Sequence, residues 1–157
     1  MSGIELALQY VHAGDYPRQD EMTSWIEAAL GAAGRDACGW ELTVRIVDEG
    51  ESRQLNAAYR GRDKPTNVLS FPFEPPPGLP AAEAQILGDL VICAPVVASE
   101  AVVQGKPERD HWAHMVVHGT LHLLGHDHLE DGEAERMETL EKRALAGIGV
   151  PDPYERE

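Results

Sequence analysis

The segment from Glu108 to Leu124 constrains the fold most, because its spacing predicts a helix that is apolar on almost every side. Its apolar residues are Trp112, Met115, Val116, Val117, Leu121, Leu123 and Leu124. A helix without a polar face is normally buried. The rest of the chain must therefore supply elements that cover it. Gly125 is expected to end it, since glycine readily adopts the positive φ found at helix C-termini.

The other periodicities predict strands and helices that alternate along the chain. Strands are expected at Ile4–Val11, Leu42–Val47, Val68–Phe73 and Leu90–Cys93, and helices at Asp20–Ala33, Glu49–Tyr59, Pro95–Gln104 and from Asp131 to before Pro151. Asp48 is expected to cap the second helix, and Pro95 to lie in the first turn of the third. The 157 residues therefore predict a single α+β domain, residues 1–157, with about four strands in a mixed sheet and about five helices.

Three histidines on and after the buried helix have a spacing that suits a metal ion. His118 and His122 are four residues apart, so both rings project from one face of the helix. A turn at Gly125 would bring His128 back towards them. Three imidazoles with a fourth position open are typical of catalytic zinc sites, so one Zn²⁺ per chain is predicted. The H-x3-H-x5-H spacing with a glycine at the turn is also that of the H-E-x-x-H-x-x-G-x-x-H metalloproteases, and we expect a zincin-like helix.

The residue after the first histidine argues against a peptidase. Those proteases have a glutamate there as the general base, whereas this chain has Gly119. A metal could still act as a Lewis acid and lower the pKa of a bound water to about 7. Two other interpretations remain: the histidines are ordinary packed or solvated side chains, or they hold a structural metal. Structural zinc usually has four protein ligands, which are often cysteines.

Two neighbours of the histidine triplet are further candidates. His114 lies one turn before His118 on roughly the same face, where it could line the cleft or support a ligand imidazole. Packing in the interior would explain His114 equally well. Asp127 could orient a ligand imidazole or accept a proton, or it could simply support the turn.

A short basic segment lies between the second helix and the third strand. Arg60, Arg62 and Lys64 occur in a chain whose formal net charge is −14. An acidic chain is unsuited to broad, non-specific binding of nucleic acid, so an anionic substrate would have to meet this patch or the metal. An arginine beside a phosphate could bind it bidentately and stabilise the charge that grows in the transition state. The alternative is a solvated loop.

Cysteine usage and hydropathy predict a cytoplasmic protein that does not enter a membrane. Cys38 and Cys93 are far apart and form no metal-binding pair, which fits a reducing compartment. The first residues show no signal-peptide pattern, and no apolar run approaches the length of about 18 residues expected of a membrane span.

Three segments together resemble the YbeY family of bacterial endoribonucleases, the rRNA maturation factors. They are Tyr59–Pro72, Gly88–Ile92 and His118–His128, and the likeness runs from about Leu42 to Tyr154. The resemblance implies a zinc-dependent, single-strand-specific endoribonuclease that acts in maturation of the 16S rRNA 3' end and in ribosome quality control. It implies zinc on His118, His122 and His128, and a catalytic role for Arg60. It also implies 16S rRNA precursor as substrate, with small-subunit ribosomal proteins and a ribosome-associated GTPase as partners.

Two rival functions remain open beside the nuclease. One is a ribosome-assembly factor with a largely structural metal. The other is a metal-dependent hydrolase of a small substrate, which the acidic surface would suit better than it suits RNA. If the protein is a nuclease, Arg62, Lys64, His114 and Asp127 are candidates for contacts with the substrate or with a metal ligand.

Overall fold

The structure is a computed structural model, and it describes residues 4–11, 14, 16–35, 39–74, 77–78, 86–125 and 131–154. Its sheet consists of β1 (Glu5–Tyr10), β2 (Glu41–Val47), β3 (Val68–Pro72) and β4 (Ile86–Cys93). The strand order is β1-β2-β4-β3, with β1, β2 and β4 parallel and β3 antiparallel to β4. The predicted four-stranded mixed sheet is confirmed in the described part of the chain, and β3 lies at its edge.

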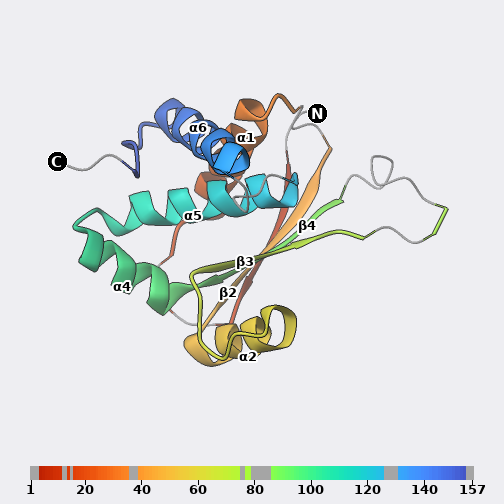
Figure 1. The fold of residues 1–157 in the computed structure, drawn as a ribbon, viewed down its shortest axis with the longest axis vertical. Helices are drawn as coiled ribbons and strands as arrows, with labels where there is room; N and C mark the ends of the chain where they lie inside the picture. Colours follow the sequence, from red (N-terminus) through yellow and green to blue (C-terminus); the bar gives the residue numbers. More distant parts are fainter. Residues whose placement is uncertain are drawn as a thin grey trace.

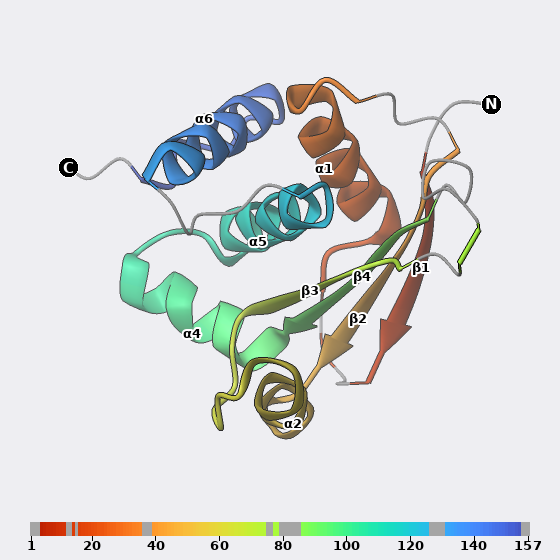
Figure 2. The ribbon, with the colours of Figure 1, turned by 45° about the vertical axis from the view of Figure 1, so that its right-hand side comes forward.

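Five helices pack around this sheet within the described residues, as predicted. They are α1 (Gln19–Ala32), α2 (Glu49–Arg60), α4 (Ala94–Gln104), α5 (Glu108–Leu123) and α6 (Asp131–Gly147). Figures 1 and 2 show α1, α5 and α6 on one side of the sheet and α2 on the other. No helix in the described ranges is long and apolar enough to cross a membrane.

The predicted burial of α5 is confirmed. Eleven of its sixteen residues are buried, and Trp112, Val116 and Leu121 are among the least exposed side chains of the core. α1 and α6 cover α5 from above, and β3 and β4 lie beneath it (Figure 2). A smaller apolar cluster of Val47, Leu69, Val91 and Cys93 lies on the opposite face of the sheet, where α2 packs.

Local sequence signals explain how several elements begin and end. The Asp48 carboxylate accepts a hydrogen bond from the Glu51 N–H at 2.9 Å, which caps α2 as expected. Pro95 lies in the first turn of α4. β4, in contrast, begins at Ile86 rather than at the predicted Leu90. Because it is paired with β2 on one side and β3 on the other, the hydrogen-bonded ladders extend the strand through Gly88, a residue with low strand propensity.

Candidate metal centre

His118 and His122 are the only two residues that are not fully buried in the stretch of α5 from His111 to Leu123. Both side chains are half-buried, and their ring centroids are 4.7 Å apart with an interplanar angle of 65°. Gly125 has φ 95°, and its N–H donates to the His122 carbonyl at 3.0 Å. The chain therefore turns directly after the two imidazoles, as its sequence predicts. His128 and Asp127, the other predicted residues of this motif, lie outside the described residues.

A buried carboxylate joins His118 to His114. Glu141 of α6 is 1% exposed, and its Oε2 lies 3.1 Å from His118 Nδ1. Its Oε1 lies 2.7 Å from His114 Nε2 and also accepts a hydrogen bond from the Tyr154 hydroxyl at 2.6 Å. Burial raises the pKa of Glu141, but hydrogen bonds from the two histidines more than offset this and lower it to about 2. Desolvation lowers the pKa of His114, although its hydrogen bond to Glu141 opposes this shift.

The group formed by His114, His118 and Glu141 could itself hold a metal ion, because one ligand atom from each lies within 4.8 Å of the others. The sequence analysis did not identify Glu141 as part of this site. One signal could have identified it. Glu141 stands four residues after Met137 and four before Leu145, on the apolar inner stripe of α6. A charged residue at such a position needs a buried partner.

Gly119, at the position of the protease glutamate, is a packing glycine. A Cβ atom there would lie 2.7 Å from Leu90 Cδ2 and 3.3 Å from Ser70 Oγ. The Ser70 hydroxyl donates to the Gly119 carbonyl at 3.2 Å, so α5 contacts the sheet directly at this residue. A glutamate side chain would therefore point into the sheet. This contact explains why a glycine, and not the glutamate of the proteases, occupies position 119.

His111 belongs to a different contact, one that links α5 to α4 and the start of β3. His111 Nε2 lies 2.8 Å from the Glu100 carboxylate, which also accepts from the Asn67 side-chain amide at 3.1 Å. The hydrogen bond from His111 lowers the pKa of Glu100, although burial opposes it. Asn67 in turn accepts from the Val68 N–H, so these three residues set the position of the edge strand relative to α5.

The basic segment begins at the last residue of α2 and is held against that helix. Ser52 donates to the Thr66 carbonyl at 3.0 Å and accepts from the Thr66 N–H at 2.9 Å. The Asn56 amide donates to the Lys64 carbonyl at 2.8 Å. Both Ser52 and Asn56 are buried, so the loop between α2 and β3 is fixed from its inner side.

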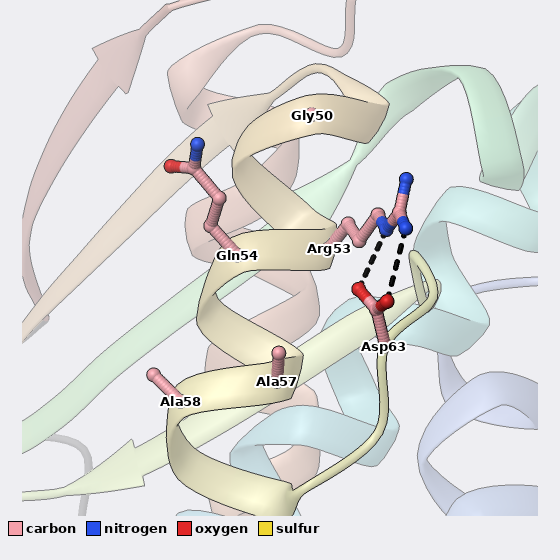
Figure 3. A pocket seen from close by; sticks show the side chains of 6 residues that line it. All are labelled: Gly50, Arg53, Gln54, Ala57, Ala58 and Asp63. Carbon is pink, nitrogen blue, oxygen red and sulfur yellow. Dashed lines mark hydrogen bonds and ion pairs between the residues drawn. The ribbon is translucent and has the colours of Figure 1, made fainter.

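Three predicted cations of this loop are exposed, and its one acid is paired. Arg60, Arg62 and Lys64 are all exposed. The Asp63 carboxylate accepts two hydrogen bonds from the Arg53 guanidinium, at 2.7 and 3.0 Å, as Figure 3 shows. This pair lines a shallow pocket on α2 together with Gly50, Gln54, Ala57 and Ala58. Because Arg53 balances Asp63, the loop presents a net positive charge.

α2, which ends at Arg60, and α5, which carries the histidines, lie on opposite faces of the sheet (Figure 2). Arg60 ends α2, and the preceding Tyr59 packs edge-on against Phe71 of β3 with ring centroids 5.0 Å apart. Ser70, the neighbouring residue of β3, faces α5 instead. A second hollow of about 430 Å³, lined by Tyr59, Phe71, Arg45 and Asp89 among others, is on the α2 side as well. Neither hollow contains His118 or His122.

The chain is similar to known proteins over almost its whole length. The model of the family described as "Endoribonuclease YbeY" matches residues 11–149. A protein named Endoribonuclease YbeY from Halorhodospira halophila is 65% identical over 99% of both chains. Another from Alkalilimnicola ehrlichii is 58% identical over 96% of this chain and 91% of the relative. A solution structure, TM1509 from Thermotoga maritima, has the same fold, with a TM-score of 0.54 and 22% identity over 98% of this chain and 99% of that one. The family match and the two highly identical relatives establish that this chain belongs to the YbeY endoribonuclease family.

Proposed function

We propose that this protein is a cytoplasmic, zinc-dependent, single-strand-specific endoribonuclease that acts in 16S rRNA 3'-end maturation and ribosome quality control. Its membership of the YbeY endoribonuclease family carries the proposal, since the relatives named above match nearly the full chain. The proposed substrate is 16S rRNA precursor. The proposed partners are small-subunit ribosomal proteins and a ribosome-associated GTPase.

The donor set supports one zinc ion per chain on His118, His122 and His128. Imidazole nitrogens are common zinc ligands, and His118 and His122 are adjacent on one turn of α5 and partly open to solvent. Glu141 accepts a hydrogen bond from His118 at Nδ1, which is the usual arrangement for a histidine that uses its other nitrogen to bind a metal. When bound there, zinc would supply a Lewis acid beside the scissile phosphate and lower the pKa of the attacking water.

The charges around β3 support a path for RNA. Because β3 is the edge strand, a single strand of RNA lying across it would meet the histidines on one side and the loop cations on the other. Arg60 would bind the scissile or a neighbouring phosphate bidentately and stabilise the charge that develops on it. Arg62 and Lys64 would hold adjacent phosphates. The net charge of −14 makes binding of free RNA weak and favours placement by a ribosomal partner.

The first experiment measures zinc by elemental analysis in protein purified without a metal-affinity tag. About one zinc per chain is expected in the native protein, with loss in His118→Ala, His122→Ala and His128→Ala while circular dichroism shows a retained fold. The same preparations are then assayed on single-stranded RNA spanning the 16S 3' end and on a duplex of the same sequence. Arg60→Ala should slow cleavage without removing zinc, whereas Arg35→Ala, an exposed arginine after α1, should change neither.

Two results would contradict the proposal. If the native protein binds no zinc even after zinc is added, the proposed metal centre is wrong. If the zinc-loaded protein leaves single-stranded RNA intact, both alone and with small ribosomal subunits, the proposed nuclease activity is wrong.

A second candidate, an assembly factor with a structural metal, is favoured by one observation. The ligand atoms of His114, His118 and Glu141 lie close enough to share an ion, and both His114 and Glu141 are buried. A metal enclosed there would have little room for a substrate. In that case His114→Ala would lose zinc and His122→Ala would retain it, which is the reverse of the expectation for the catalytic site.

A further inference from the structure

Glu141 is a carboxylate on the apolar side of its helix. Its neighbours along the inner stripe of α6 are Met137, Leu140, Ala144 and Leu145, all of them buried. Glu141 itself is only 1% exposed. An ionised side chain at such a site is costly unless charged or hydrogen-bonding groups surround it. The surrounding groups therefore indicate what the carboxylate does.

Three donors converge on its two oxygens. His118 Nδ1 lies 3.1 Å from Oε2, while His114 Nε2 at 2.7 Å and the Tyr154 hydroxyl at 2.6 Å contact Oε1. An ionised carboxylate only accepts hydrogen bonds, so each histidine must carry its proton on the nitrogen that faces Glu141. For a neutral His118 this places the proton on Nδ1 and the lone pair on Nε2, the nitrogen directed away from Glu141.

We propose that Glu141 is a positioning residue that fixes the Nδ1–H tautomer and the ring orientation of His118 and makes its Nε2 a better metal ligand. The inference rests on the proposed function, in which His118 binds zinc. A carboxylate that accepts from the outer nitrogen of a ligand histidine orients the ring and raises its basicity. Glu141 does not contact substrate and acts only through His118.

His114 and Tyr154 hold the carboxylate in place from the other side. The two rings meet edge-on with centroids 5.5 Å apart, and both donate to the same oxygen. Oε1 is thus fully engaged, which leaves Oε2 directed at His118. The C-terminal segment beyond α6 therefore contributes, through Tyr154, to the geometry of a histidine on α5.

The test compares Glu141→Gln with Glu135→Gln, which removes the same charge from an exposed position on the same helix. A glutamine offers one acceptor oxygen and an NH₂ donor to three groups that all donate. With the oxygen kept at the position of Oε1, where it serves both His114 and Tyr154, the NH₂ faces His118 Nδ1 and His118 must change tautomer. Two-bond ¹H–¹⁵N NMR on the metal-free proteins reads the His118 tautomer directly. Competition with a chromophoric chelator gives the Kd for zinc, and Co²⁺ absorption reports the coordination geometry.

The expected result is a native His118 in the Nδ1–H form. Glu141→Gln should lose this single tautomer, bind zinc about 10–100-fold more weakly and change the Co²⁺ spectrum, while Glu135→Gln matches the native protein. A native His118 protonated on Nε2 would overturn the proposal, and this measurement requires no variant to fold. Unchanged tautomer and zinc Kd in a folded Glu141→Gln protein would overturn it as well.

Two further measurements separate this inference from its alternatives. If His114→Ala loses zinc as completely as His118→Ala, then His114 and Glu141 are direct ligands and the positioning role is wrong. RNA cleavage is assayed separately on the zinc-loaded native protein. Failure to cleave would refute the nuclease, while the NMR and zinc data would still decide the role of Glu141.

Discussion

The substitution Gly119→Ala tests whether the contact between α5 and the sheet excludes even a methyl group. The added Cβ would lie 2.7 Å from Leu90 Cδ2 and 3.3 Å from the Ser70 hydroxyl oxygen. Both distances are shorter than ordinary van der Waals contact, so the leucine must shift or the helix must move away from β4. Leu90 is fully buried in the core, and its side chain has little space to move into.

Two opposing effects set the magnitude. Alanine has a better helix propensity than glycine, which contributes about 0.5–1 kcal/mol of stability. Overpacking of a well-packed core costs about 1–3 kcal/mol. The packing cost is the larger effect, so the free energy of unfolding should fall by about 1 kcal/mol, which corresponds to a Tm lower by about 2–4 °C for a domain of this size.

The assay is urea unfolding of the metal-free protein followed by circular dichroism. Gly31→Ala in α1 is the matched control, because a Cβ there meets no atom within 4 Å and the residue is exposed. The control should gain up to about 1 kcal/mol from propensity alone. The packing argument would be refuted if Gly119→Ala were as stable as the native protein or gained as much as the control.

Other contacts give further expectations. Ser52→Ala leaves the Thr66 backbone N–H and carbonyl without their partner, and should lower the free energy of unfolding by about 1–3 kcal/mol in the same urea assay. Arg53→Ala breaks an ion pair whose side chains are 58% and 72% exposed, so a loss above about 1 kcal/mol would contradict the structure. The hydrogen bond from His111 lowers the pKa of Glu100 below its ordinary value of 4.5. The stabilisation that this bond provides is therefore complete above pH 4.5 and is lost as the pH falls through the lower pKa of the folded state. Glu100→Gln should therefore reduce the acid sensitivity of Tm below about pH 5, and an unchanged pH profile would contradict that contact. Zinc at 100 times the Kd of the native protein should raise its free energy of unfolding by about 2.7 kcal/mol. An equal gain in His122→Ala at the same zinc concentration would exclude that histidine as a ligand.

The sequence by itself determined the elements and much of the histidine motif. The all-round apolar character of residues 108–124 predicted a buried helix, and Gly125 predicted the turn after it. Asp48 and Pro95 marked the beginnings of two helices. These features depend on interactions between residues a few positions apart, such as helical spacing, capping and backbone φ. A linear pattern contains that information.

Only the tertiary structure decided which distant groups meet. The Glu141 carboxylate comes from a different helix and lies 23 residues after His118 in the sequence. The contact of Gly119 with Leu90 and Ser70 and the position of α2 across the sheet from α5 also depend on how the elements pack. Periodicity shows that a residue faces inwards but does not identify the residue it will contact, because that depends on the relative placement of elements far apart in the chain. For this reason the sequence indicated a missing protease base at Gly119, whereas the structure indicated a close helix–sheet contact.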